Sequence, residues 1–396
     1  MSRSYSKTIA FLSPKIDTFT NPTLVALIQK LIAKGYDIIY YGFDQLFIPS
    51  EYRKYIEFKE LPFNFYTLDK NPKNIFKFLK QYLKLIRDFK WNNKIKAMIC
   101  VDPMGLVIGG RIKKVIGFKL IYASFEIFFE DEFFVQRKRV LKKLEMNYSK
   151  LSDIVIIQDD RREKLLKSVN NFTDKTIFLK IPVSPLKTEV IDNDYDIYNE
   201  FYIPADKIIA VYSGSLQNWS GISEIISLFP DKWDNDFWLL IHTHQKLDKN
   251  SELKYEIENL IANNQNISLH EKPFYRFEEY FNFLSKCNIG IATYFPNNLD
   301  IFAGKNLEAI GLSSGKFSTY MMLGIPTITT NHYIYKILNN KYRYGEIINS
   351  ISDLPGALKK IRSGLTAKSE SCRLLYDKVL NPDLRIDDLI NHIENS

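Results

Sequence analysis

The chain has 396 residues, of which 45% are hydrophobic and 25% are charged. These proportions exclude an intrinsically disordered protein, and the length favours two domains of roughly 150–200 residues each. No run of about 18 apolar residues occurs and residues 1–7 are polar, so we expect a cytoplasmic protein without a signal segment or membrane span. The cysteines Cys100, Cys287 and Cys372 have no metal-binding or redox spacing, which suits a reducing compartment.

The formal net charge of +8 is divided unevenly along the chain. Residues 1–182 hold 33 of the 54 Lys and Arg and 19 of the 46 Asp and Glu, which leaves 21 and 27 for the remainder. The first part is therefore net +14 and the second net −6. The basic part suits an anionic partner such as membrane lipid, a lipid-linked phosphate or nucleic acid, although a lysine-rich solvated surface explains the same counts.

The first half alternates between short apolar runs and amphipathic stretches. The pattern predicts strands at Thr8–Leu12, 37–41, 97–101, 119–124 and 153–158, and helices at 23–33 and 135–151. Such alternation implies a parallel sheet covered by helices, so residues 1–182 are predicted to form a Rossmann-like α/β domain.

A second series of the same kind begins after a polar segment. Residues 183–206, which include two prolines and an acidic run, are interpreted as a linker. Strands are then predicted at Ile208–Ser213, Phe237–His242, Ile267–His270, 289–293 and Thr327–Thr330, with helices at 251–263 and Phe277–Ser285. Residues 207–396 should therefore form a second doubly wound domain, and the two sheets are expected to face each other across a ligand-binding cleft.

Residues 311–330 read as a loop, a helix and a strand. Ser313 or Ser314 can cap a helix over 317–323, and Gly324 suits the left-handed position that follows it. A helix start that holds Ser, Ser, Gly and Lys offers backbone N–H groups, hydroxyls and a cation to an anion. We interpret it as a diphosphate site, with an ordinary capped helix between two strands as the alternative.

This segment is not a P-loop. The spacing from Gly311 to Gly315 is one residue too short, and Phe317 stands where Ser or Thr would hold magnesium. Residues 315–328 instead resemble the segment Asn-Lys-Leu-Phe-Glu-Tyr-Met-x-x-Gly-x-Pro-Val-Ile of nucleotide-sugar glycosyltransferases of the two-domain GT-B type, particularly the retaining family 4. Weaker similarities occur at 144–165, 208–221, 287–293 and 344–361.

The resemblance implies a GT-B fold whose last helix, here 385–394, crosses back onto the first domain. It also implies transfer of a hexose-type unit from a nucleoside diphosphate sugar, without an obligatory metal or other cofactor. The diphosphate is expected at Ser313, Ser314, Gly315 and Lys316, where a helix dipole, backbone amides and a cation can neutralise it.

Two features of the family are altered in this chain. Family members carry a basic pair in the loop after the first strand of the second domain, which here contains Ser213, Gly214 and Ser215. Ser215 and Ser220 occupy the two basic positions, so Lys15 or Lys305 would have to supply the missing charge.

The family also has two glutamates, separated by seven residues, that bind the sugar and the ribose. Gly311 and Thr319 stand in these places. Glu308 is the nearest carboxylate that could replace the first, and the Thr319 hydroxyl could bind the ribose. A threonine on the helix surface is the plainer interpretation of Thr319.

In the first domain, residues 121–126 resemble a family strand end that reads tyrosine-aspartate-serine-histidine-glutamate, with Phe125 in place of the histidine. Glu126 follows the strand and is predicted to line the cleft, where it would bind the acceptor or remove its proton. Asp102 and Asp17, each after a predicted strand, are further catalytic candidates. A loop-capping role is the alternative for both.

Other polar clusters suggest no metal site. Asp192 and Asp194 lie in the predicted linker without a preceding strand, and His242 and His244 lack a third ligand in recognisable spacing. No histidine precedes His242, which excludes a Ser-His-Asp triad from the first domain.

Residues 69–96 are predicted to form a basic amphipathic helix. An apolar stripe consists of Ile75, Phe76, Leu79, Tyr82, Leu83 and Ile86, and further apolar residues are Phe78, Leu85 and Phe89. Packing on its own domain explains the stripe, while the additional aromatic residues and the lysines suit anionic lipid. We therefore expect peripheral association with the inner face of a membrane.

Together these observations predict a glycosyltransferase that moves a sugar to a saccharide or lipid-linked glycan in surface polysaccharide or glycoconjugate synthesis. The missing basic pair and glutamates favour an alternative, a non-catalytic protein that binds nucleotide or glycan. A nucleotide-sugar epimerase of the same fold is a third possibility. Nucleic acid is not expected as a partner, because only the charge favours it and no binding motif is present.

Overall fold

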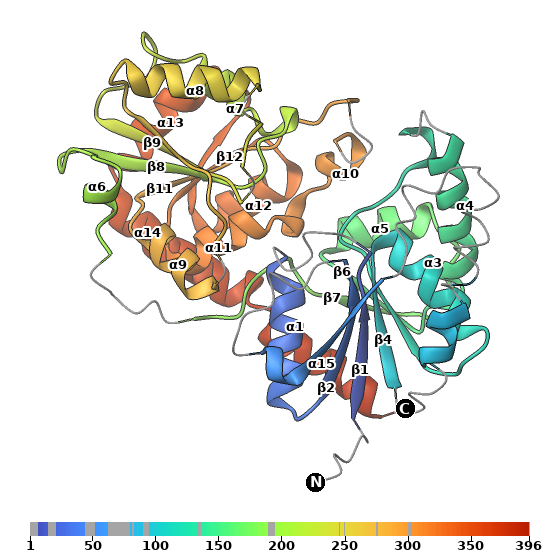
Figure 1. The fold of residues 1–396 in the computed structure, drawn as a ribbon. Helices are drawn as coiled ribbons and strands as arrows, with labels where there is room; N and C mark the ends of the chain where they lie inside the picture. Colours follow the sequence, from blue (N-terminus) through green and yellow to red (C-terminus); the bar gives the residue numbers. More distant parts are fainter. Residues whose placement is uncertain are drawn as a thin grey trace. The chain divides into compact units, whose positions relative to one another are not determined.

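The computed structural model describes residues 7–14, 21–43, 52–61, 80, 83–89, 95–132, 136–188, 195–244, 246–248, 250–274, 276–299 and 303–395. The chain divides into two compact units (Figure 1). Unit 1 comprises Met1–Val183 and Pro382–Ser396, and unit 2 comprises Ser184–Asn381.

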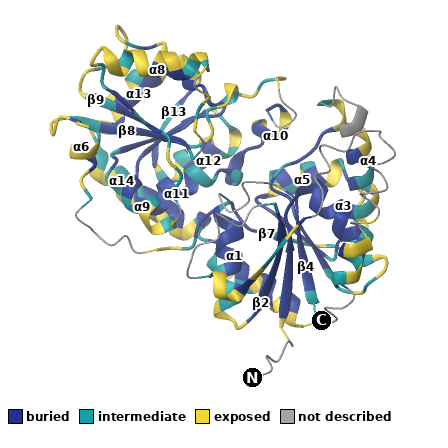
Figure 2. Ribbon diagram, viewed as in Figure 1, coloured by how far each residue is buried: buried dark blue, intermediate teal, exposed yellow. Residues whose placement is uncertain are grey.

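Unit 1 contains a parallel sheet in the order β3-β2-β1-β4-β5-β6-β7. Its strands are β1 (Thr8–Leu12), β2 (Asp37–Gly42), β3 (Ile56–Glu60), β4 (Ile95–Val101), β5 (Lys119–Ala123), β6 (Ile154–Ile157) and β7 (Ile177–Lys180). The described helices of unit 1 include α1 (Pro22–Ala33), α3 (Asp102–Lys113), α4 (Gln136–Ser149), α5 (Asp160–Ser168) and α15 (Asp383–Glu394). The central strands are buried and the helices expose their outer faces (Figure 2).

Helix α15 belongs to unit 1 although it follows all of unit 2 in the sequence. Lys30 of α1 binds two carboxylates of α15, with its Nζ 2.6 Å from Asp383 and 3.0 Å from Asp387. At the other end of the helix, the Tyr36 hydroxyl donates a hydrogen bond to Glu394. These contacts fasten α15 to the segment from α1 to β2.

Unit 2 contains a second parallel sheet in the order β10-β9-β8-β11-β12-β13. Its strands are β8 (Ile208–Ser213), β9 (Phe237–His242), β10 (Ile267–His270), β11 (Ile289–Ala292), β12 (Thr327–Thr330) and β13 (Gly345–Ile348). Its helices include α6 (Ile197–Glu200), α7 (Ile222–Ile226), α8 (Glu252–Ala262), α9 (Phe277–Ser285), α10 (Lys305–Glu308), α11 (Gly315–Leu323), α12 (Tyr333–Tyr342), α13 (Leu354–Arg362) and α14 (Leu365–Leu375). Two parallel sheets flanked by helices confirm the predicted fold class.

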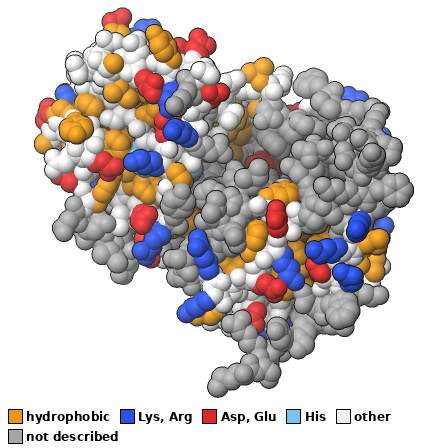
Figure 3. All heavy atoms as spheres, in the orientation of Figure 1, with side chains coloured by type: hydrophobic (Ala, Val, Ile, Leu, Met, Phe, Trp, Pro, Cys, Tyr) orange, Lys and Arg blue, Asp and Glu red, His pale blue; other side chains and the backbone are white. Residues whose placement is uncertain are grey.

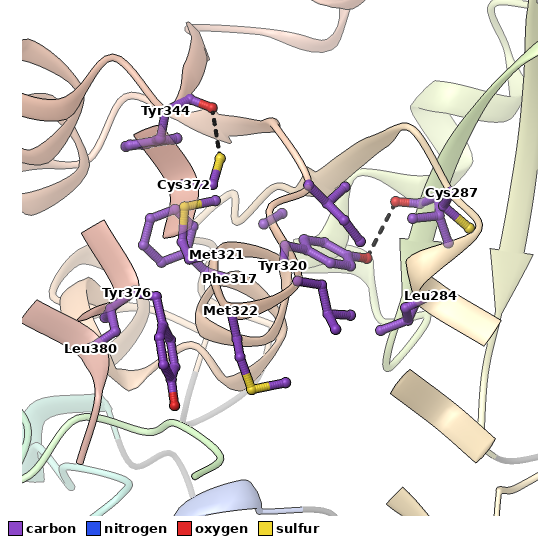
Figure 4. Close-up of a cluster of buried hydrophobic side chains, with 14 of the residues drawn as sticks. Leu284, Cys287, Phe317, Tyr320, Met321, Met322, Tyr344, Cys372, Tyr376 and Leu380 are labelled. Carbon is purple, nitrogen blue, oxygen red and sulfur yellow. Dashed lines mark hydrogen bonds between the residues drawn. The ribbon is translucent and has the colours of Figure 1, made fainter. Parts of the chain in front are cut away.

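Apolar side chains cover both faces of this second sheet. Successive residues of β8 point to opposite faces, so Val211 joins the core beneath α9 and α11 while Tyr212 joins the core beneath α7 and α13. Figure 4 shows part of the first core, in which the Tyr320 hydroxyl reaches the carbonyl of Val211 at 3.3 Å. This bond helps to hold α11 in place at the end of β8.

The predicted loop, helix and strand at 311–330 are confirmed. Ser314 caps α11, and Gly324 ends it with a left-handed φ of 73°. A Cβ at Gly324 would lie 2.4 Å from Cζ of Arg373, so a larger residue would also have to displace this guanidinium. The predicted linker differs in one respect, since α6 falls within it and Ile197 and Ile203 are buried in unit 2.

Candidate functional site

The start of α11 presents backbone N–H groups to an anion. The Ser314 hydroxyl accepts a hydrogen bond from the N–H of Phe317 at 3.1 Å and forms another with the Tyr294 hydroxyl. Within the described part of the chain, no group accepts a hydrogen bond from the N–H of Gly315 or Lys316. Because both N–H groups lie at the positive end of a helix dipole, they suit a phosphate or carboxylate oxygen.

The Lys316 side chain is half-buried beside this helix start, and its amine is buried. Its Nζ lies 3.8 Å from the centroid of the Tyr212 ring and 5.1 Å from that of Tyr294. Among the described residues, none accepts a hydrogen bond from this amine. Burial lowers the pKa of Lys316 from its ordinary value of 10.5 to about 7.

Gly214 brings the backbone close to the same amine. This residue directly follows β8 and has a φ of 150°, in the region that favours glycine. A Cβ at Gly214 would lie 3.4 Å from Cε and 3.5 Å from Nζ of Lys316. These are ordinary van der Waals distances, so the φ angle, and not the space around the amine, is what favours glycine here.

Ser213 is less accessible than the prediction requires. Its hydroxyl forms hydrogen bonds with Nδ1 of His242 at 2.7 Å and with the Tyr280 hydroxyl at 2.8 Å, and its N–H donates to the Tyr320 hydroxyl. The residue is buried. Ser213 thus links β8 to β9, α9 and α11, and its polar groups are already used within the protein.

The two serines at the family's basic positions lie in different environments. Ser215 is exposed, and its carbonyl accepts a hydrogen bond from the Tyr212 hydroxyl at 2.7 Å. Ser220 is fully buried, accepts a hydrogen bond from the N–H of Ile222 at the start of α7, and receives another from Thr293 on its carbonyl. A lysine would fit at position 215 but not at position 220.

The remaining predicted donor residues are dispersed. Ser313 is half-buried in the 3₁₀ turn before α11, while Glu308 is exposed at the end of α10 and Lys305 is exposed at its start. Thr319 lies in the second turn of α11 and is only 3% exposed, so the interpretation as a surface threonine is wrong. Gly311 adopts a φ of 41°, a conformation that a glutamate would not readily adopt.

The structure therefore brings together Gly214, Ser314, Gly315 and Lys316 from the prediction and adds Tyr212 and Tyr294. The two tyrosines were missed, although each lies at or just beyond the carboxyl end of a parallel strand, where ligand-binding residues gather. The ring of Trp219 stacks on Tyr294, with centroids 5.7 Å apart.

A histidine cluster lies at the carboxyl ends of β9 and β10. Nε2 of His242 lies 3.3 Å from the carbonyl of Lys272, and its ring contacts those of His244 and His270. Burial, together with these two histidines, holds the pKa of His242 well below its ordinary value. In the described ranges, no three His, Cys, Asp or Glu side chains converge as a metal site would need.

In unit 1, the loop after β5 is held by Asp102. Oδ1 of Asp102 accepts hydrogen bonds from the N–H of Phe125 at 2.8 Å and of Glu126 at 2.9 Å. Asp102 is buried as the first residue of α3 and has a positive φ of 56°, which a non-glycine residue rarely adopts. Its carboxylate therefore supports the loop that carries Glu126.

Arg162 of α5 reaches the same loop and was not identified from the sequence. Although fully buried, it donates from Nη2 to the carbonyl of Phe125 at 2.7 Å and from Nε to Gln158 at 2.6 Å. Burial lowers the pKa of Arg162, while the charges of Glu126, Asp159 and Asp102 raise it. Glu126, which is half-buried, is thus partly engaged in compensating a buried guanidinium.

No protein-family profile matches the chain, and no curated protein matches its sequence. Solved structures match almost its whole length. A sucrose-phosphate synthase from Thermosynechococcus elongatus superposes with a TM-score of 0.69 at 13% identity, covering 98% of each chain. HepE from Anabaena, in complex with UDP-glucose, superposes with a TM-score of 0.71 at 10% identity, covering 98% of this chain and 100% of HepE. The chain has the GT-B fold.

A further GT-B match is a glycosyltransferase from Rickettsia africae, with a TM-score of 0.69 at 13% identity over 98% of each chain. At these identities the likeness concerns the fold. The resemblance to the retaining family 4 stays a prediction.

Several predicted residues of this GT-B chain lie outside the described residues. They are Lys15, Asp17, Asp192, Asp194 and most of the basic segment 69–96. In the described part of that segment, Leu85 and Phe89 are buried, with the ring centroid of Phe89 4.5 Å from that of Tyr41, while Leu83 is 64% exposed. The buried face is thus the one that carries Leu85 and Phe89, and Leu83 of the predicted stripe faces outward.

None of the helices in the described ranges combines the length and apolar character that crossing a membrane would require. On the face drawn in Figure 3, acidic and basic side chains are interspersed over the described surface of unit 2.

Proposed function

We propose that unit 2 binds the nucleoside diphosphate of a sugar donor at the start of α11, and that the protein transfers the sugar to a saccharide or lipid-linked glycan. The observation that carries this proposal is the buried amine of Lys316. Among the described residues, none accepts a hydrogen bond from it. An unsatisfied buried donor costs roughly 1–3 kcal/mol, and more when it is charged. A phosphate oxygen would remove that cost, and the N–H groups of Gly315 and Lys316 could bind the same anion.

The ligands of structural neighbours support this choice. HepE was solved with UDP and with UDP-glucose, and a trehalose-6-phosphate enzyme from E. coli with UDP-2-fluoro glucose. UDP-glucose is therefore the first donor to test.

In this proposal, the negative charge that develops on the departing diphosphate is neutralised by the helix dipole, the two N–H groups and Lys316. No metal takes part. A retaining outcome and an acceptor-binding role for Glu126 rest on the resemblance to the family. An acceptor linked to lipid would place the protein at a membrane surface, which agrees with the basic charge of residues 1–182.

Calorimetric titration with UDP-glucose tests the donor site. Lys316→Ala should weaken binding by about tenfold or more, because a charge-assisted hydrogen bond contributes roughly 1.5–3 kcal/mol. Lys336→Ala, which removes an exposed lysine of α12, is the matched control and should bind as the wild type does. Equal affinities of the wild type and Lys316→Ala would reject the site.

A second candidate function is binding of the nucleotide sugar without turnover. The buried Ser220 and the positive φ of Gly311 favour it, since neither position can accept the charged residue of the family without rearrangement. Assays of donor hydrolysis and of transfer to a panel of saccharide and lipid-linked acceptors separate the two functions. Tight binding without either reaction would support the non-catalytic alternative.

A further inference from the structure

The surroundings of Lys316 disfavour the protonated form of its amine when no anion is bound. Lys316 is the second residue of α11, where the helix dipole repels a cation, and the first turn of this helix contains no acidic residue. Its Nζ is buried, and no described group accepts a hydrogen bond from it. Two independent effects, desolvation and the helix dipole, therefore favour the neutral amine.

The groups that face this amine do not reverse that preference. Tyr212 of β8 and Tyr294 after β11 present their rings, which favour the cation modestly. Tyr320 lies one turn further along α11, and burial raises its pKa, so it brings no negative charge. The loop 214–221 contains no ionisable side chain.

Charged residues elsewhere in the described part do not compensate either. The nearest candidates along the chain, Lys305 and Glu308 of α10, are exposed, and burial alone accounts for the lowered pKa of Lys316, which is about 7. The amine thus changes charge near neutral pH instead of near its ordinary value of 10.5.

We propose that a nucleoside diphosphate sugar binds unit 2 together with one proton, which Nζ of Lys316 takes up from solvent as the phosphates approach. This inference rests on the proposed function. A diphosphate supplies both the acceptor and the negative charge that the empty site lacks, so it stabilises the ammonium form and raises its pKa. The tyrosine rings can contact either form, which lets the amine stay in place through the change.

The linkage has a definite sign. Below about pH 7 the amine is already protonated, so binding takes up little proton and the affinity is at its maximum. Above that pH the proton must be acquired on binding, so the affinity falls by up to tenfold for each unit of pH. From about pH 6 to about pH 8.5 the expected loss is about 30-fold.

Calorimetry of the wild-type protein with UDP-glucose, in buffers of differing ionisation enthalpy, measures the proton uptake directly. UDP-glucose is preferred to UDP because its phosphates do not titrate in this range. We expect uptake of nearly one proton per site at about pH 8.5 and almost none at about pH 6. Lys316→Arg should bind without proton uptake and with little dependence on pH, because guanidinium stays charged. Lys336→Arg, on the surface of α12, should retain the wild-type behaviour.

A second measurement needs no ligand. In protein labelled with ¹³C at the lysine ε-carbons, one NMR signal should titrate near pH 7 and be missing from both Lys316→Arg and Lys316→Met. The proposal is overturned if no lysine signal titrates below about pH 9, or if proton uptake persists in Lys316→Arg. If none of the UDP, GDP, ADP and dTDP sugars binds at about pH 6, the proposed function itself fails, whatever the NMR titration gives.

Discussion

Asp102 and Arg162 hold opposite sides of one peptide group, the one that joins Phe125 to Glu126. The carboxylate accepts from its N–H at 2.9 Å, and the guanidinium donates to its carbonyl at 2.7 Å. Both side chains are buried, and a buried charge costs free energy unless it is paired and hydrogen-bonded. The arrangement fixes the backbone of Glu126 at the carboxyl end of β5.

Replacing Arg162 should therefore destabilise unit 1. Arg162→Leu leaves the Phe125 carbonyl without its buried donor and the nearby carboxylates without their counter-charge, so we expect a loss of about 3–5 kcal/mol. Urea unfolding followed by fluorescence measures it. Lys164→Leu, an exposed position on the same helix, should change the free energy of unfolding by no more than about 0.5 kcal/mol. Comparable values for the two variants would contradict the role given to Arg162.

Glu126→Gln should lower turnover much more than donor affinity. An acceptor-orienting group or a base acts after the donor has bound, so kcat falls while the calorimetric Kd for UDP-glucose stays near the wild-type value. The expected fall in kcat is about 100-fold or more. Glu130→Gln, at an exposed position on the same segment, is the control. If kcat is unchanged, the task of Glu126 is confined to neutralising Arg162.

Introducing a basic residue should have different effects at Ser215 and at Ser220, the two positions where the family has its basic pair. Ser215→Arg adds a cation at an exposed position near Lys316, so the affinity for UDP-glucose should rise about tenfold. Ser220→Lys should instead lower the unfolding temperature, since it places an ammonium group in a fully buried position. Gln217→Arg, an exposed change in the same loop, should have a smaller effect on affinity than Ser215→Arg. Calorimetry and thermal unfolding measure these effects, and a stable, tighter-binding Ser220→Lys variant would contradict the account.

Peripheral membrane binding should depend on charge in the basic segment. Sedimentation with anionic liposomes is expected at low salt and should weaken as salt shortens the Debye length from about 30 Å at 0.01 M to about 8 Å at 0.15 M. Charge reversal of the exposed Lys80 and Lys84 to Glu should reduce binding, at about 1 kcal/mol for each lysine removed. The same reversal at Lys336 and Lys360 of unit 2 should not. Liposome binding that depends neither on the salt concentration nor on the content of anionic lipid would reject the electrostatic explanation.

Much of the fold could be predicted because central parallel strands are apolar on both faces. β1, β8 and β9 were predicted at their observed bounds for this reason. The edge strand β10 and the threonine-rich β12 were also predicted at their observed bounds. The strands that were missed are edge strands, namely β3, β7 and β13. In β3, Glu57 and Lys59 interrupt the apolar pattern, which is therefore too weak to recognise.

The candidate site was predictable only where local chemistry specifies it. The cap of α11 and its free N–H groups follow from a few consecutive residues around Ser314. The contact of Tyr212 and Tyr294 with Lys316, by contrast, joins residues up to 104 positions apart, from Tyr212 to Lys316, and depends on the order of strands in the sheet. Arg162 was missed for the same reason, since a surface helix rich in charge gives no sign that one of its arginines points inward.

The place of α15 in unit 1 has a consequence for how the chain is made. Unit 2 is a continuous segment, whereas unit 1 needs residues that are synthesised after Asn381. On the ribosome, unit 2 can therefore reach its final fold before unit 1 is complete. Until α15 is made, the surface of α1 around Lys30, which later contacts Asp383 and Asp387, stays uncovered. During that time, the part of unit 1 that precedes unit 2 lacks one of its helices and exposes a surface to which a chaperone could bind.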